Sequence, residues 1–268
     1  MSVLKVFSYL PNPRVWKSVI AGKIAGIEVE VVGDKPAELG KWLWDFEPKP
    51  LTDAERTKDS PYARTGKRGF SGVLFKTDAF LSAHPFGTVP AAFSPDGEVG
   101  IFESNSILRS VARSAPDGTA LYGSSGYESS RIDSFLDAGL VFAREAQVYL
   151  LGMDSLSKET YDRMAAAYEF YLSGIEATLA NNKYLVGQSL SIADISFVCD
   201  FAQFLREGHY EDQLSQQGFT LVSQSGSKTY PRSFEHMLEL NARPEFSDVM
   251  GSYLNWYRRK LADQGDEK

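Results

Sequence analysis

The chain has 268 residues, of which 43% are hydrophobic and 24% are charged, a composition typical of globular proteins. Its formal net charge of −7 argues against nucleic acid as the main partner. We find no basic-then-apolar leader and no apolar run long enough to span a bilayer, so we expect a cytoplasmic protein without membrane attachment. The single cysteine, Cys199, cannot form an internal disulfide. The three histidines lack metal-ligand spacing, so we expect no metal site.

The first elements in chain order predict a β–α–β unit. LKVFS (4–8) alternates as a strand, residues 15–24 have apolar side chains at helical spacing, and IEVEVV (27–32) predicts a second strand. Gly26 is a natural end for the helix. Such units favour two parallel strands joined by a right-handed crossover.

The second strand is followed by a long connection, which we treat as an insertion at about residues 34–80. More than fifty residues separate the second strand from Val89, an unusual length inside a compact domain. Its middle, EPKPLTDAERTKDSPYARTGKRGFSG, is rich in Pro, Gly and charge, and we interpret it as an excursion over the surface. Its end, TDAFLSAHPFG, predicts a short helix that returns to the core.

A β-hairpin and a helix complete the first half of the chain. The stretch GTVPAAFSPDGEVGIFESNSI (87–107) has two apolar runs on either side of a PDG turn. A helix is expected to begin near Ser104, whose hydroxyl suits an N-cap, and to run to about Arg113. The Gly/Ser-rich segment 114–128 is the best domain boundary.

The second half of the chain has helical periodicity almost throughout. Helices are expected over residues 130–152, 158–181, 191–207, 233–240 and 245–261, with a second long loop at 208–232. Ser191 to Asp194 form a capping box with Asp in place of the usual Glu, which we interpret as a structural device that starts a helix. Cys199 lies on that apolar helix and is interpreted as a core residue rather than a nucleophile. We therefore predict an α/β domain over residues 1–113 and an all-helical domain over 127–268.

Three motifs in this order resemble the glutathione transferase superfamily. They are VP before the third strand, ES at the start of the third helix, and SLSIADISF in the helical half. LKVFSY, GTVPAAF, GIFESNSI, YLVGQSLSIADISFVC and NARPEF are similar to the transferase-like module of the gamma subunit of the translation elongation factor 1 complex. The resemblance implies a thioredoxin-like N-terminal domain followed by an all-helical C-terminal domain.

The resemblance also implies where glutathione binds. The Val89–Pro90 bond would be cis, and the backbone of Val89 would pair with the peptide ligand; otherwise, Pro90 merely starts an edge strand. Ser104 and its neighbouring amide would hold the γ-glutamyl carboxylate, because a helix N-terminus favours anions. Glu103 would face the α-ammonium group. Capping alone also explains Ser104, but it does not explain the acid beside it.

The thiol of glutathione is expected at the turn after the first strand. Lowering a thiol pKa by two from about 8.5 requires roughly 2.7 kcal/mol of preferential thiolate stabilisation. In that turn we rank Asn12 first as a donor to the thiolate and Arg14 second as an electrostatic stabiliser, followed by Ser8 and Tyr9. The alternative is that Asn12 only caps the helix. A second, hydrophobic substrate is expected between the domains, with Tyr9 among the aromatic candidates for its walls.

These features favour a cytosolic glutathione transferase that uses glutathione as a cosubstrate and acts on a hydrophobic small molecule. The resemblance implies a homodimer. The main alternative is a non-catalytic protein-interaction module like the elongation-factor gamma subunit. The polar end LADQGDEK soon after the last helix favours a stand-alone enzyme, because that family usually carries a further domain. A redox enzyme is disfavoured, because the turn after the first strand has no cysteine.

Overall fold

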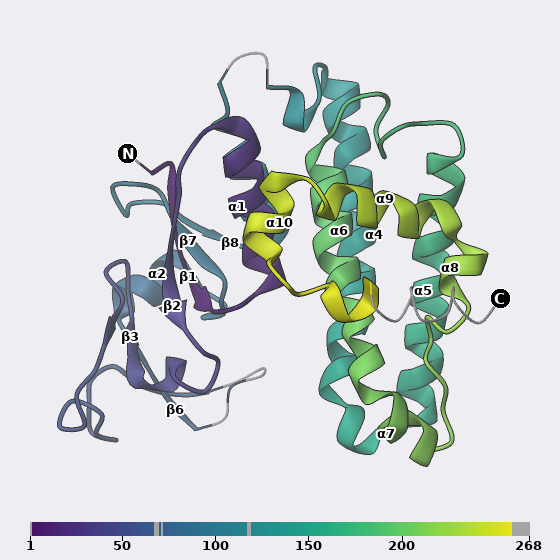
Figure 1. The fold of residues 1–268 in the computed structure, drawn as a ribbon. Coiled ribbons are helices and arrows are strands. Elements are labelled where there is room, and N and C mark those ends of the chain that lie inside the picture. The colour runs from purple at the N-terminus through teal and green to yellow at the C-terminus, as the bar shows by residue number, and fades with distance from the viewer. Residues whose placement is uncertain (1, 67–69, 71, 117–118, 259–268) are drawn as a thin grey trace. The chain divides into compact units, whose positions relative to one another are not determined.

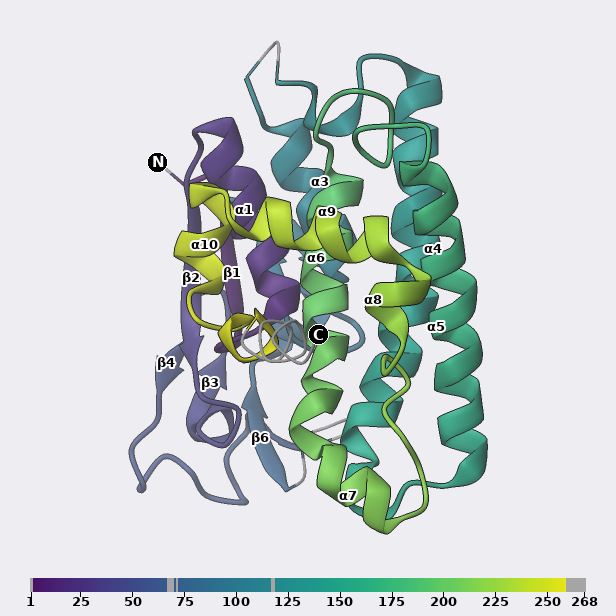
Figure 2. The ribbon, with the colours of Figure 1, turned by 45° about the vertical axis from the view of Figure 1, so that its right-hand side comes forward.

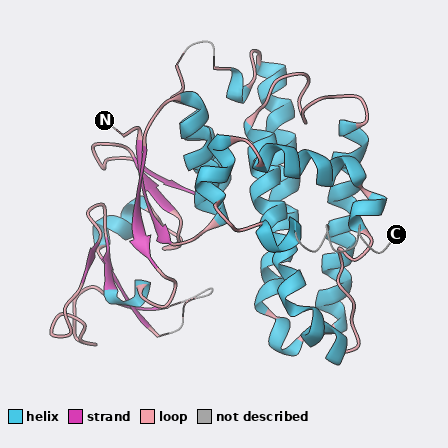
Figure 3. Cartoon of the chain, viewed as in Figure 1, coloured by secondary structure: helices cyan, strands magenta, loops and turns pink. Residues whose placement is uncertain are grey.

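The structure is a computed structural model that describes residues 2–66, 70, 72–116 and 119–258. The chain divides into two compact units, Met1–Ala115 and Pro116–Lys268. Strands occur in unit 1, and unit 2 is helical in the part that the structure describes (Figure 3). This is the expected α/β plus all-α class, with the strands in unit 1 and a helical unit 2. No helix in the described part of the chain is long and apolar enough to cross a membrane.

The main sheet of unit 1 has four strands in the order β2-β1-β7-β8. The parallel pair β1–β2 confirms the predicted β–α–β unit, while β7 runs antiparallel to both β1 and β8. The elements are β1 (Leu4–Tyr9), α1 (Pro13–Ala25), β2 (Val29–Asp34), α2 (Asp78–Ala83), β7 (Ala91–Phe93), β8 (Gly100–Phe102) and α3 (Ser104–Arg113). Helices α1 and α3 pack against each other, and α2 lies on the other face of the sheet (Figure 1).

Residues that prefer helix ends determine the limits of these helices. Asn12 caps α1 by accepting a hydrogen bond from the Arg14 N–H, and Pro13 occupies the first helical position. Gly26 ends α1 with a φ of 68°, as expected for a left-handed cap. Thr77 caps the predicted short helix α2 by accepting from the Phe80 N–H. Local sequence therefore accounts for both helices.

The insertion is not a surface excursion alone, because much of it forms a second sheet. The strands are β3 (Trp42–Trp44), β4 (Lys49–Pro50), β5 (Ala63–Thr65) and β6 (Val73–Lys76), in the order β4-β3-β6-β5. Most residues between 47 and 62 are exposed, which agrees with the prediction for that part, and residues 67–69 and 71 lie outside the described residues. Within WLW and VLFK the apolar side chains of Leu43, Trp44, Leu74 and Phe75 are buried, and this gain offsets the cost of ordering the insertion.

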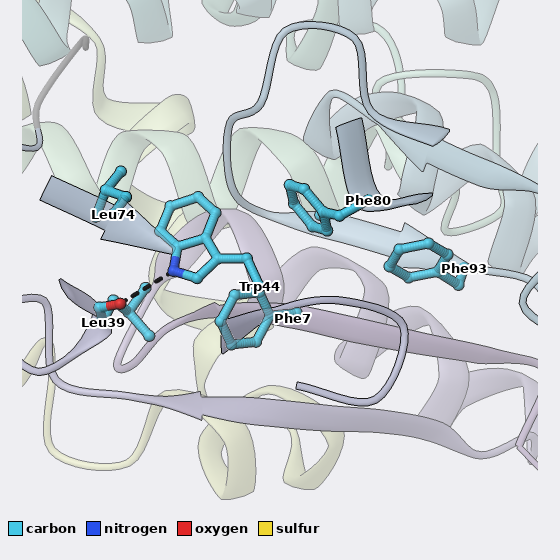
Figure 4. Close-up of a cluster of buried hydrophobic side chains, with 7 residues drawn as sticks. Phe7, Leu39, Trp44, Leu74, Phe80 and Phe93 are labelled. Atoms are coloured by element: carbon cyan, nitrogen blue, oxygen red, sulfur yellow. Dashed lines mark hydrogen bonds between the residues drawn. The ribbon is translucent and has the colours of Figure 1, made fainter. Parts of the chain in front are cut away.

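A single hydrophobic cluster joins the two sheets of unit 1 (Figure 4). Trp44 is fully buried at its centre, and its indole N–H donates to the Leu39 carbonyl oxygen at 3.0 Å. Its ring meets those of Phe7 and Phe80 edge-on, at centroid distances of 5.6 and 5.9 Å. The cluster contains Phe7, Leu39, Trp44, Leu74, Phe80, Ala91 and Phe93. The insertion is thus part of the core that supports β1 and β7.

Unit 2 is built around three long helices, with α4 packed against both α5 and α6 (Figure 2). The helices are α4 (Gly126–Leu151), α5 (Lys158–Leu179), α6 (Ile192–Phe204), α7 (Glu211–Gln216), α8 (Gly226–Thr229), α9 (Pro231–Asn241) and α10 (Pro244–Met250). The capping box at the start of α6 is present: the Asp194 carboxylate accepts from the Ser191 N–H, and Ser191 caps the helix. Cys199 is buried, as expected for a core residue.

Two expectations for unit 2 were wrong in detail. The second long loop is not irregular throughout, because it contains α7 and α8. Its residues Val222 and Ser223 are held by the buried side chain of Glu207, which accepts hydrogen bonds from their N–H groups. The last predicted helix is interrupted rather than continuous: α10 stops at Met250, Gly251 follows with a φ of 53°, and residues 255–258 are helical again. Residues 259–261 of that prediction lie outside the described residues.

Candidate functional site

The candidate glutathione site lies at one end of the main sheet of unit 1. The register pairs Phe7 with Ala91 and Ala91 with Phe102. Continuing these ladders by two residues brings the end of β1, the residue before Pro90 and the start of α3 to the same end of the sheet. The tertiary structure therefore brings the predicted thiol turn near the predicted peptide and carboxylate contacts.

The peptide-binding position has the expected backbone. The Val89–Pro90 bond is cis. Val89 is partly buried against the core cluster, and neither its N–H nor its C=O has a hydrogen-bond partner among the described residues. Because an unpaired backbone edge next to a strand is suited to an extended peptide, Val89 provides a donor and an acceptor for such a ligand.

The start of α3 differs from the predicted N-cap. Glu103, not Ser104, occupies the cap position, and its side chain makes no capping bond. The Glu103 carbonyl oxygen accepts from the N–H groups of Ser106 and Ile107. Ser104 is the first helical residue and is 7% exposed, and neither its N–H nor its hydroxyl has a partner among the described residues. This position is therefore suited to an anion.

Glu103 has a strained backbone. Its φ of 66° is the only positive value at a non-glycine residue in the described part of the chain. Such a conformation costs about 1–3 kcal/mol and is concentrated at ligand-binding and active sites. Glu103 is exposed beside the start of α3.

A buried lysine supports this helix end, and the sequence analysis did not identify it. Lys17 on α1 is 1% exposed, and its ammonium group donates to the Asn105 side-chain oxygen at 2.9 Å. The contact joins α1 to the first turn of α3, next to Ser104. Helical spacing contained the signal, because Lys17 lies four residues from Pro13 and from Ala21, which are both buried.

The turn after β1, where the thiol of glutathione is expected, is more buried than its polar residues suggest. Asn12 and Ser8 are both fully buried, and the Asn12 side-chain amide donates to the Ser8 hydroxyl at 3.0 Å. Arg14 and Tyr9 are partly exposed, and the Tyr9 ring lies 6.5 Å from that of Phe70. The bond between Leu10 and Pro11, in the same turn, is cis.

Backbone donors at the start of α1 are already in use. Pro13 has no N–H, and the Arg14 N–H donates to the Asn12 side chain. The N–H groups of Val15 and Trp16 donate to the Asn12 carbonyl oxygen at 2.9 and 3.1 Å. A thiolate at this turn must therefore rely on side-chain donors and on the helix dipole.

Together, the mixed sheet, the residue before Pro90 and the start of α3 define a protein with the glutathione transferase fold. Residues 132–223 match the family described as Glutathione S-transferase, C-terminal domain. The structure of the glutathione transferase URE2P8 from Phanerochaete chrysosporium with oxidized glutathione superposes with a TM-score of 0.65, at 16% identity and over 98% of each chain. A glutathione S-transferase from Methylobacillus flagellatus with bound GSH superposes with a TM-score of 0.62, at 15% identity, over 92% of this chain and 98% of the other.

The sequence relatives are of two kinds. Elongation factor 1-gamma 2 of Oryza sativa subsp. japonica is 31% identical over 90% of this chain and 46% of its own length. The Glutathione S-transferase-like protein LUC7 of a Fusarium species is 27% identical over 93% of this chain and 86% of its own. Residues 132–223 thus match the glutathione transferase C-terminal domain family, and the chain's homologues include elongation factor 1-gamma and transferase-like proteins. It spans about half the length of the rice relative.

Proposed function

We propose that the protein is a glutathione transferase, which binds glutathione on unit 1 and stabilises its thiolate for attack on a hydrophobic electrophile. One observation carries the proposal: unpaired polar groups of Val89 and Ser104 lie at the same end of the sheet, beside the strained Glu103. The first N–H groups of any helix lack intrahelical partners, but a helix that merely followed a strand would not need the strain at Glu103.

Each end of glutathione has a matching group in the proposal. The cysteinyl backbone of the ligand pairs with the N–H and C=O of Val89, as one strand pairs with another. The γ-glutamyl carboxylate accepts from the N–H and hydroxyl of Ser104 at the positive end of α3. The carboxylate of Glu103 pairs with the ligand's α-ammonium group.

The thiol end is assigned to side chains. Arg14 supplies positive charge and Tyr9 a hydroxyl donor, because both are partly exposed. Asn12 and Ser8 hold the turn from behind through their mutual hydrogen bond, and Asn12 reaches a thiolate only if its amide leaves Ser8. Two side-chain contacts to an anion are sufficient for the roughly 2.7 kcal/mol that a lowering of the thiol pKa by two requires.

Calorimetry with glutathione tests binding. Ser104→Ala is expected to weaken binding about tenfold, because it removes one hydrogen bond to a charged group. Ser110→Ala, on the same helix but away from its N-terminus, is the matched control. A wild-type protein that binds no glutathione at millimolar concentration contradicts the proposal.

Thiolate absorbance of the bound ligand tests activation. We expect Arg14→Met to raise the thiol pKa in the complex and to slow conjugation with 1-chloro-2,4-dinitrobenzene, and Asn12→Ala to have the smaller effect. An unchanged titration in both variants removes Arg14 and Asn12 from the mechanism.

The second candidate is a non-catalytic protein-interaction module, which the identity of 31% to an elongation factor 1-gamma favours. It predicts binding to purified nucleotide-exchange subunits of elongation factor 1 and no glutathione conjugation. For the transferase we propose a cytoplasmic homodimer, and sedimentation velocity measures its oligomeric state. Saturable binding to exchange subunits without glutathione binding would decide in favour of the module.

A further inference from the structure

A lysine of the second sheet of unit 1 contacts the segment that leads to Val89, a residue of the proposed glutathione site. Lys76 is the last residue of β6 and is 7% exposed. Its ammonium group donates to the Gly87 carbonyl oxygen at 2.7 Å and lies 4.5 Å from the centre of the Trp44 ring. A buried ammonium group that meets a backbone carbonyl and an aromatic face is held in one orientation.

Gly87 is shaped to receive this side chain. Its φ is 57°, and a Cβ atom built on it would lie 3.2 Å from the Lys76 Nζ and 3.3 Å from the Leu81 Cδ2. The Gly87 N–H donates to the His84 carbonyl oxygen at 2.8 Å, so the residue is held on both sides. Gly87 precedes Val89 by only two residues, so only Thr88 separates the held carbonyl group from the Val89 backbone.

The neighbouring charged groups are engaged with other partners. On the β3 side, Asp45 accepts from the Thr77 hydroxyl at 2.8 Å. Arg64 of β5 pairs with Asp78 of α2 at 2.8 Å. Another titratable neighbour is His84 at the end of α2, whose pKa burial lowers to about 4, so it is neutral near pH 7. Tyr62 adjoins Lys76 through its carbonyl oxygen, which accepts from the Lys76 N–H. Burial likewise lowers the pKa of Lys76, to about 8.

We propose that Lys76 is a positioning residue for the glutathione site: its ammonium group holds the Gly87 carbonyl and thereby fixes the backbone of Val89 for the ligand. This role rests on the proposed function. It gives the insertion a part in ligand binding, although no residue of the insertion needs to touch glutathione. A charge-assisted hydrogen bond is stronger than a neutral one, so deprotonation of Lys76 loosens the Gly87–Val89 backbone.

The test uses S-methylglutathione, which has no thiol to titrate, and calorimetry at pH 6.5 and pH 9.5. Lys76→Met keeps most of the length of the side chain but removes its charge. We expect it to weaken binding about five- to tenfold at pH 6.5 and less than about twofold at pH 9.5, where the wild type has itself lost the charge. Titration of the ligand's own amine affects both proteins equally and cancels in their ratio. Lys49→Met, at a largely exposed lysine of β4, is the matched control and should leave binding unchanged.

Three results separate this inference from the proposed function. An equal loss of affinity at both pH values, or no loss at either, overturns the role of Lys76 while the transferase proposal stands. Failure of the wild type to bind S-methylglutathione at pH 6.5 overturns the proposed function and the positioning role with it. Hydrogen exchange checks the contact itself without ligand: the Gly87 amide, which donates to the His84 carbonyl oxygen, should exchange faster in Lys76→Met at pH 6.5, and unchanged exchange there contradicts the inference.

Discussion

Acidification should destabilise unit 1 through one buried histidine. His84 is 1% exposed, and neither ring nitrogen has a hydrogen-bond partner within the described residues. Three aromatic rings surround it: those of Phe93, Phe80 and Phe102, at 4.7, 5.1 and 6.4 Å. Burial lowers the pKa of His84 from 6.5 to about 4, and the nearby backbone of Ala92 offsets only part of this effect. The apolar surroundings thus oppose the charged form.

The magnitude follows from the two pKa values. Between pH 6.5 and pH 4 the unfolded chain binds the proton and the folded chain does not, so stability present above pH 6.5 is lost as the pH falls. A pKa difference of about 2.5 corresponds to about 3 kcal/mol at full protonation. Between pH 7.5 and pH 5 the expected loss from His84 is about 2 kcal/mol. This is a large part of the stability of a typical domain.

Urea denaturation at pH 7.5 and pH 5 measures the effect. Trp42 and Trp44 lie in unit 1 near the core cluster, so their fluorescence reports its unfolding. The free energy of unfolding of the wild type should fall between pH 7.5 and pH 5 by about 2 kcal/mol more than that of His84→Leu, whatever the stability of the variant at pH 7.5. His209→Gln is the comparison: burial lowers the pKa of this more exposed histidine as well, so we expect a change of the same sign but smaller than in His84→Leu. Equal losses in the wild type and His84→Leu would refute the reasoning.

Three further substitutions test the packing of both units. Gly33→Ala places a Cβ atom against the Ser8 carbonyl oxygen, so β1 and β2 must separate. The free energy of unfolding in urea should fall by at least about 2 kcal/mol, and an unchanged value contradicts the pairing of Ser8 with Gly33. Asp194→Ala leaves the buried N–H groups of Ser191 and Leu185 unpaired and should cost about 3–5 kcal/mol by circular dichroism, with a smaller cost for Asp194→Asn. Glu207→Ala should speed hydrogen exchange at Val222 and Ser223 while α5 stays protected; uniform exchange changes would contradict a local clamp.

The sequence by itself determined the features that depend on near neighbours. Asn12, Gly26 and Ser191 mark helix ends because a cap needs only the right side chain within three residues. The alternation of LKVFS and the order of the VP and ES motifs likewise indicated the class of fold and the positions of Val89 and Glu103. These signals are short in range, and the tertiary structure changed their boundaries by only a few residues.

Only the tertiary structure decided what depends on contacts between distant segments. The insertion looked like surface because its charged middle dominates its composition, yet Trp44 and Leu74 are buried against Phe7. The side chain of Asn12 looked accessible until the structure placed its amide against Ser8. Lys76 and Gly87 have no local pattern that links them, since their contact exists only after both sheets have packed. Burial and partner choice are properties of the assembled core, and neighbouring residues in the sequence do not encode them.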